Sequence, residues 1–258
     1  MSKTALITGA SSGIGFELSK IFAQNGYNLI LISQNENNLN EAFFKLKSQY
    51  EKINITIFPC DLSNIDTPKQ IYEFTKENAI DVNVLVNCAG IQIYENFHER
   101  DIYDTLQLMQ INMFAPVVLS KLFVHDMVKR KSGMILNVGS TGAFAPCALN
   151  AAYCASKAFI LHFSEGIAEE LKGSGVTVTT LCPGATKTNF AKRANIEDTK
   201  MFSNMMNPDK VAKIAYKALM KGKTIAIPGL YNKILTFSIR LIPRKISVRI
   251  GKQMMERK

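Results

Sequence analysis

Short apolar runs alternate with longer amphipathic segments along most of this chain. The runs are rich in isoleucine, leucine and valine and alternate little with polar residues, which is typical of strands buried on both faces of a parallel sheet. They predict strands at residues 3–8, 28–33, 54–59, 82–87, 133–138, 175–181 and 223–228. The segments between them predict helices near 14–25, 36–50, 67–79, 99–130, 151–172 and 208–221.

Regular alternation of strand and helix predicts an α/β fold with a doubly wound, seven-stranded, mainly parallel sheet and helices on both faces. Residues 183–208 break the alternation after the sixth predicted strand. Open α/β sheets bind ligands beyond the carboxyl ends of their strands, so we interpret this segment as a substrate lid. Residues 1–229 form one predicted dinucleotide-binding and catalytic domain, and residues 230–258 are a basic amphipathic C-terminal extension of it.

Charge is distributed unevenly. The net charge is +10, and residues 231–258 hold eight Lys or Arg and one Glu, which leaves +3 for the remainder. One interpretation is an amphipathic segment that makes peripheral contact with an anionic membrane. The other, which we favour, is a helix pair, interrupted at Pro243, that packs on the body or covers the substrate cleft. The charge is local and accompanies no binding motif, so we expect no nucleic-acid partner.

The remaining composition indicates an ordinary globular protein. Of the 258 residues, 47% are hydrophobic, which is enough for a sizeable core. The five cysteines show no CxxC spacing, and we expect free thiols and no metal site. The N-terminal stretch lacks the apolar region of a signal peptide, and there is no run of eighteen apolar residues, so we expect a cytoplasmic location.

The first predicted strand runs into the stretch TGASSGIG, residues 8–15. Gly9, Gly13 and Gly15 would permit a tight turn and close backbone approach, and the N–H groups at the start of the following helix would attract a pyrophosphate. A glycine turn alone also occurs for purely structural reasons. Its position between the first strand and the first helix favours nucleotide binding.

The stretch YCASK, residues 153–157, places a phenol and an amine one helical turn apart. A free phenol has a pKa near ~10, and a cation ~4 Å away at an effective dielectric near 20 contributes about 4 kcal/mol, or roughly 3 pKa units. Lys157 could therefore bring the pKa of Tyr153 towards neutrality. Taken alone, the pair could equally be an exposed Tyr and Lys on an amphipathic helix.

Several short motifs together resemble the short-chain dehydrogenase/reductase family, bacterial broad-specificity type. The resemblance runs from residue 3 to about 228 and implies a Rossmann-like fold. Its motifs occur in the family's order: TGASSGIG (8–15), CDLS (60–63), NCAG (87–90), Asn112 in QINMF, Ser140 in LNVGS, YCASK (153–157) and PGATKT (183–188). The pattern IPG…PR in residues 227–244 matches the longer members of the family.

The resemblance implies a catalytic role for each of four residues. Tyr153 would be the general acid/base, and Lys157 would lower its pKa and hold the nicotinamide ribose. Ser140 would orient the substrate oxygen, although a serine here could also cap a turn. Asn112 would support a water relay, although a buried asparagine could instead satisfy backbone groups.

The resemblance also implies the positions that surround the cofactor and the substrate. The cofactor positions are Gly9, Ser11, Ser12, Gly13, Ile14, Gly15, Ser33, Gln34, Asn35, Asp61, Leu62, Asn87, Ala89, Gly90, Tyr153, Lys157, Pro183, Gly184, Thr186 and Thr188. The substrate positions are Ile91, Ser140, Thr141, Phe144, Cys147, Asn150 and Tyr153.

The end of the second predicted strand bears on the choice of cofactor. An acid at this corner would bind the ribose 2′-hydroxyl of NAD and repel a 2′-phosphate. Ser33, Gln34 and Asn35 stand there, and the first acid is Glu36. The arginine common in NADP-using relatives is also missing, but Ser11, Ser33, Gln34 and Asn35 could donate neutral hydrogen bonds to a phosphate. We therefore favour NADP over NAD.

These features predict an NAD(P)-dependent oxidoreductase that interconverts a secondary alcohol and a ketone. The apolar residues of the predicted lid favour a small, hydrophobic substrate molecule. The alternatives are a 3-oxoacyl thioester reductase of lipid synthesis and a catalytically silent NADP-binding regulator. By analogy with the family we expect a homodimer or homotetramer formed through the helices near 99–130 and 151–172.

Overall fold

The computed structural model describes residues 3–257 of the chain. Met1, Ser2 and Lys258, the last a basic residue of the C-terminal extension, lie outside the described residues. One parallel sheet has the strand order β3-β2-β1-β4-β5-β6-β7, which confirms the predicted doubly wound fold. Its strands are β1 (Thr4–Thr8), β2 (Asn28–Ser33), β3 (Ile55–Pro59), β4 (Val82–Asn87), β5 (Gly133–Val138), β6 (Val176–Leu181) and β7 (Ile225–Ala226).

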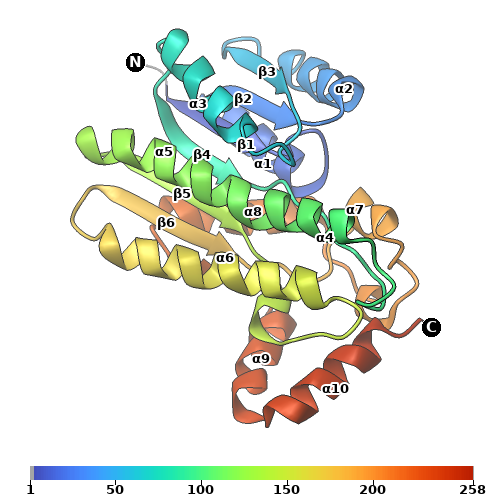
Figure 1. Ribbon diagram of the computed structural model, residues 1–258. Helices are drawn as coiled ribbons and strands as arrows, with labels where there is room; N and C mark the ends of the chain where they lie inside the picture. The colour runs from blue at the N-terminus through green and yellow to red at the C-terminus, as the bar shows by residue number, and fades with distance from the viewer. Residues whose placement is uncertain (1–2, 258) are drawn as a thin grey trace.

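Helices cover both faces of the sheet, as Figure 1 shows. On β1, Ala5 and Ile7 belong to one apolar cluster and Leu6 to the other, because successive side chains of a strand point to opposite faces. One cluster includes α1 (Gly13–Gln24), α2 (Glu36–Lys47) and α8 (Pro208–Met220). The other includes α3 (Thr67–Glu77), α5 (Ala115–Lys129) and part of α6 (Ala151–Glu170). The molecule is therefore a three-layer sandwich.

The helix predicted over 99–130 begins later and is interrupted. Asp101 caps its first turn by accepting a hydrogen bond from the N–H of Tyr103, so that α4 spans Ile102–Met109. A π-helical turn over Gln110–Phe114 then joins α4 to α5. By length and composition alone the run Ile102–Lys129 could cross a membrane, with 39% of its most apolar window buried in the protein.

The seventh strand is shorter than the predicted 223–228. β7 pairs with β6 through two residues at the edge of the sheet, and Pro228 just beyond it has no N–H to donate to a ladder. The chain then forms α9 (Leu230–Ser238), a 3₁₀ turn over Ile239–Leu241 and α10 (Arg244–Met255). Pro243 stands at the N-cap of α10, where the break between the two helices was expected.

The packing of α1 on the sheet provides a test of the core. Phe22 is fully buried, and its ring meets the edges of Tyr27 and Tyr216 at centroid distances of 5.2 Å each. We expect Phe22→Ala to lower the free energy of unfolding by about 3–5 kcal/mol, measured by urea denaturation. Phe44→Ala is the matched control, because the Phe44 side chain is 66% exposed and its loss should cost under about 0.5 kcal/mol. Equal losses in the two variants would contradict this assignment of the core.

Candidate active site

The loops after β1 and β4 meet at the point where the strand order reverses. Thr8 Oγ1 accepts hydrogen bonds from the N–H groups of Cys88 and Ala89, both at 3.0 Å. Gly9 has a positive φ of 68°, and a Cβ on it would lie 3.0 Å from the Cα of Ala89. Only glycine fits this approach comfortably. Thr8 was not predicted as a site residue, although it opens the TGASSGIG stretch.

The N-terminus of α1 forms the predicted cradle. Gly13 has a φ of +57°, and a Cβ there would lie 3.0 Å from the methyl group of Thr188. Ser12 is the N-cap of α1 but makes no side-chain capping hydrogen bond, so no side chain caps the first N–H groups of the helix. Free N–H groups and the positive end of the helix dipole suit a pyrophosphate. The residues present therefore fit a dinucleotide.

Three predicted cofactor residues, Leu62, Asn87 and Ala89, line one small hollow beside this cradle. The buried Asn87 side chain, however, donates to Asn137 Oδ1 at 2.8 Å and to Ser120 Oγ at 3.2 Å. Its Nδ2 therefore ties β4 to β5 and α5. The Oδ1 atom of Asn87 has no hydrogen-bond partner among residues 3–257 and remains able to accept one.

The predicted phosphate corner is partly occupied by internal hydrogen bonds. Ser11 Oγ and Ser33 Oγ lie 2.9 Å apart. Gln34 Nε2 donates to Asp61 Oδ2 at 2.8 Å, so these two predicted residues orient each other. Asn35 Oδ1 caps α2 by accepting from the N–H of Asn38. The side-chain oxygen of Asn35 is therefore used to cap α2. The hydroxyls of Ser11 and Ser33 and the amide of Gln34 are the polar groups that remain at this corner.

The four predicted catalytic residues converge beyond the ends of β4 and β5. Lys157 is 5% exposed, and its Nζ donates to the Val138 carbonyl at 2.9 Å and lies 5.7 Å from the centre of the Tyr153 ring. A Cβ on Gly90 would lie 3.2 Å from Asn112 Oδ1 and 3.4 Å from Lys157 Nζ. A Cβ on Gly142 would lie 3.4 Å from Ser140 Oγ and 3.8 Å from Tyr153 Cε1.

Asn112 and Ser140 also carry out the structural roles that the sequence left open. Asn112 stands in the π-helical turn, where it accepts from the N–H of Ile91 at 2.9 Å and donates to the Ile91 carbonyl at 2.8 Å. It also donates to Ser156 Oγ at 3.2 Å, which links α6 to the loop after β4. Ser140 Oγ accepts from the N–H of Gly142 and caps the 3₁₀ turn Thr141–Phe144. Both side chains therefore shape the site.

Lys157 does not bring the pKa of Tyr153 towards neutrality in the protein without cofactor. Burial raises the pKa of Tyr153 above its ordinary 10.0, although its interaction with the Ser140 side chain acts in the opposite direction. Burial also lowers the pKa of Lys157 from 10.5 to about 8. Removal of both groups from water favours their neutral forms, and this effect of burial is the largest influence on the pKa of each group.

The predicted substrate residues divide between two places. Cys147 and Tyr153 belong to one apolar cluster with lid residues such as Ala191 and Phe202. The ring of Phe190 in α7 (Asn189–Arg193) lies 5.9 Å from that of Tyr153. Phe144, in contrast, packs in a separate cluster with Cys182 and other residues near β7. Phe144 therefore lies outside the apolar cluster around Tyr153.

The loop after β6 joins the site through its backbone. The Pro183 carbonyl accepts from the N–H of Thr141 at 2.9 Å. Thr186 Oγ1 donates to the Gly184 carbonyl at 3.0 Å, and Thr188 Oγ1 caps α7 by accepting from the N–H of Phe190. Both hydroxyls are thus engaged with their own loop, which begins the predicted lid.

Two residues of the C-terminal helices reach the site and were not predicted. Met255 is fully buried among the lid residues, and its carbonyl accepts from Tyr94 Oη at 2.7 Å. Its sulfur lies 3.7 Å from Nδ2 of the predicted substrate residue Asn150. A Cβ on Gly184 would lie 2.6 Å from Asn232 Oδ1 in α9. Nothing in the basic pattern of the tail marks these two residues.

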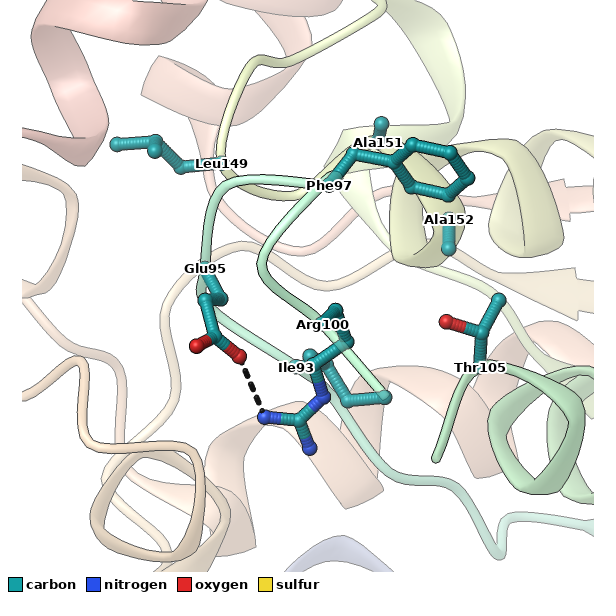
Figure 2. A pocket seen from close by; sticks show the side chains of 8 residues that line it. All are labelled: Ile93, Glu95, Phe97, Arg100, Thr105, Leu149, Ala151 and Ala152. Atoms are coloured by element: carbon teal, nitrogen blue, oxygen red, sulfur yellow. Dashed lines mark hydrogen bonds and ion pairs between the residues drawn. The ribbon is translucent and has the colours of Figure 1, made fainter. Parts of the chain in front are cut away.

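A separate hollow lies beside the catalytic residues. In Figure 2, Glu95 faces Arg100 across it, with a 2.9 Å ion pair, and Phe97 lies beside Ala151 and Ala152 at the start of α6. Leu149 also lines it and belongs to the cluster around Tyr153. Tyr153, Ser140 and Lys157 do not line this hollow. This hollow is therefore separate from the apolar cluster around Tyr153, where the predicted catalytic residues meet.

Comparisons with known proteins agree with this geometry. The family model described as short chain dehydrogenase matches residues 3–199. The chain is 29% identical to a fatty acyl-CoA reductase of Acinetobacter baylyi, over 97% of this chain and 88% of that protein. Among solved structures it is similar to a short-chain dehydrogenase from Sphingobium yanoikuyae in complex with NADPH (TM-score 0.82, 27% identity, covering 93% and 94% of the two chains). It is also similar to a bulky-bulky ketone specific alcohol dehydrogenase from Comamonas testosteroni (TM-score 0.78, 26% identity, 93% of each chain).

The lowered pKa of Lys157 leads to a prediction for stability. Between pH values of about 8 and 10.5 the unfolded chain binds more protons at this side chain than the folded one, so its contribution to the free energy of unfolding rises with pH. We expect the difference between the wild type and Lys157→Met to change in favour of the wild type by about 2 kcal/mol from about pH 8 to about pH 10. Urea denaturation at several pH values measures this. A difference independent of pH would contradict it.

Proposed function

The chain belongs to the short-chain dehydrogenase family and is an oxidoreductase that acts on alcohol and ketone groups, and on that premise we propose that it interconverts a secondary alcohol and a ketone on a hydrophobic substrate, with NADP preferred over NAD. The observation that carries this proposal is the convergence of Ser140, Tyr153, Lys157 and Asn112 next to the glycine cradle. Each of the four offers the chemical group that the reaction needs.

The cradle would hold the cofactor through the backbone of Gly13, Ile14 and Gly15 at the N-terminus of α1, with Ala89 and Leu62 beside the adenosine. Lys157 would hold the ribose next to the reacting ring. When bound, a nicotinamide cofactor supplies or accepts the hydride and, in its oxidised form, carries a positive charge that favours an ionised phenol nearby. The residues of the chain bind, orient and handle the proton.

In the direction of reduction, Tyr153 Oη would donate its proton to the ketone oxygen, and Ser140 Oγ would hold that oxygen by a hydrogen bond. The raised pKa of Tyr153 keeps the phenol protonated, which is the form that this direction requires. In the direction of oxidation, the same phenol must first lose its proton. Asn112 would fix the loop after β4 against α6 and so hold Lys157 beside Tyr153.

The walls of the pocket support a hydrophobic substrate. Phe202, Met255, Tyr153 and Cys147 belong to one apolar cluster, and the Phe190 ring lies 5.9 Å from that of Tyr153. The similarity to an enzyme named for bulky ketones supports a ketone or alcohol with large apolar substituents. The similarity to a very-long-chain 3-oxoacyl-CoA reductase of Pyrenophora tritici-repentis (35% identity over 67% of this chain) supports the second candidate, reduction of a 3-oxoacyl thioester of lipid synthesis.

We also propose self-association through the long helices. The exposed side chains of Leu106 and Phe114 on the run from α4 to α5, and of Phe159 on α6, are large and apolar. Exposed apolar side chains on helices are a common basis of subunit contact. A homodimer or homotetramer in the cytoplasm is the assembly that we expect.

Replacement of the phenol tests the proton transfer. We expect Tyr153→Phe to reduce kcat for ketone reduction by about 10²–10⁴-fold, because the variant has no proton to donate. The dissociation constant for NADPH, measured by fluorescence, should stay within about twofold, because the catalytic hydroxyl contributes little to cofactor binding. Tyr103→Phe is the matched control, since Tyr103 is exposed on α4 and should keep full activity.

Two results would count against this proposal. Retention of activity by Tyr153→Phe would remove the proposed role of the phenol. Tight binding of NADPH by the wild type, without turnover on any of a panel of ketones and 3-oxoacyl thioesters, would favour the catalytically silent regulator.

The choice of cofactor is tested separately at the corner after β2. We expect a higher kcat/KM with NADPH than with NADH. Ser11, Ser33 and Gln34 can donate hydrogen bonds to the 2′-phosphate, and positions 33–35 hold no acidic residue that would repel it. Gln34→Arg should raise the preference for NADPH by about tenfold through a charged hydrogen bond. A wild-type preference for NADH would show that NADP was wrongly favoured.

A further inference from the structure

The helix α9 has its polar side turned inward and its apolar side outward. Thr236 is 3% exposed and donates to the Asn232 carbonyl at 2.9 Å, while Asn232 Nδ2 donates to the Pro228 carbonyl at 2.7 Å. On the other side, Leu230, Ile234 and Phe237 follow one another at helical spacing and are 73%, 61% and 63% exposed. A helix that only covers the body of a protein would show the reverse arrangement.

Other exposed side chains extend this surface. Tyr231 at the start of α9 is exposed, and so is Leu241 in the 3₁₀ turn before α10. We call Leu230, Tyr231, Ile234, Phe237 and Leu241 the C-terminal apolar face. In Figure 1, α9 and α10 lie beyond α6 at one end of the molecule.

Basic side chains accompany this face without acidic partners. Six of them lie exposed on α9, the 3₁₀ turn and α10: Lys233, Arg240, Arg244, Lys245, Arg249 and Lys252. None of the six forms an ion pair with any residue between 3 and 257. Residues 230–255 contain no Asp or Glu at all. The two helices thus combine exposed apolar side chains with uncompensated positive charge.

We infer that the C-terminal apolar face and the six cations around it dock the protein on an anionic lipid surface. Apolar side chains would enter the boundary between headgroups and acyl chains, and the cations would meet the lipid phosphates. A second copy of this chain is the rival occupant. It would bring another set of cations, and no carboxylate from the same segment, against the first set, so the charge is complementary to lipid and not to itself.

The docked surface would be continuous with the wall of the substrate pocket. The inner side of α10 contacts Cys147, a predicted substrate residue. The Gly251 carbonyl accepts a hydrogen bond from Cys147 Sγ at 3.2 Å. Four residues further along α10, Met255 packs against the cluster around Tyr153. If the proposed function is right, docking would place this wall of the pocket next to the membrane. The docking itself does not depend on what the enzyme reduces.

The test is the co-sedimentation of the whole protein with vesicles of phosphatidylcholine alone and with phosphatidylglycerol added. We expect binding to the anionic vesicles and much weaker binding to the zwitterionic ones. The triple variant Arg240→Gln, Arg244→Gln, Lys245→Gln should bind the anionic vesicles about a hundredfold more weakly, at roughly fivefold for each cation. The triple variant Ile234→Ser, Phe237→Ser, Leu241→Ser removes only exposed apolar side chains and should also lose binding.

The matched control is Lys217→Gln, Lys221→Gln, Lys223→Gln. This control removes the same number of positive charges, but from exposed lysines that precede β7 and so lie outside α9 and α10. This control should bind like the wild type, and circular dichroism checks the fold of every variant independently of turnover. The proposal is overturned if the wild type does not sediment with anionic vesicles, or if the control loses as much binding as the Arg240 variant. It is also overturned if the apolar variant lowers the mass of the lipid-free protein, since a second copy would then occupy the face.

Discussion

The hydrogen bonds from the N–H groups of Cys88 and Ala89 to the Thr8 hydroxyl hold together two loops that lie 80 residues apart in the chain. They close the point where the strand order reverses, between β1 and β4. The two loops lie so close together that position 9 has no room for a side chain. α1 begins shortly afterwards, at Gly13, and no side chain caps its N-terminus. The cofactor cradle is therefore a consequence of how the two central strands end.

The same closure organises the proposed catalytic residues from the other side. The loop after β4 continues to Gly90 and Ile91, which Asn112 holds from the π-helical turn. Asn112 also reaches Ser156 on α6, the helix that carries Tyr153 and Lys157. The buried Asn112 carboxamide thus joins the loop after β4, the π-helical turn between α4 and α5, and α6. Burial there disfavours the charged forms of both groups, so that the pKa of Tyr153 is raised and the pKa of Lys157 is lowered.

Much of this arrangement could be predicted from the sequence because it depends on local patterns. Buried parallel strands leave continuous apolar runs, and the glycines near positions 9–15 follow directly from close backbone approach. What the patterns missed depends on contacts between distant segments. The inward use of Asn87, the orientation of Gln34 by Asp61 and the separate packing of Phe144 all follow from neighbours that no local spacing specifies. The pKa of Tyr153 was misjudged for the same reason, since burial is a property of the whole fold.

The C-terminal helices show most clearly how one segment can satisfy two environments. The Asn232 side chain packs against Gly184, which has no side chain to collide with it. Met255 fills the apolar cluster next to Tyr153. These inward contacts fix the rotation of both helices, because each helix must present those residues to the body. Once that rotation is fixed, Leu230, Ile234 and Phe237 have no position left except the outer side of α9. Exposure of those apolar side chains is therefore a consequence of the contacts that α9 makes with the body on its other side, and the proposed lipid surface would supply the apolar environment that they otherwise lack.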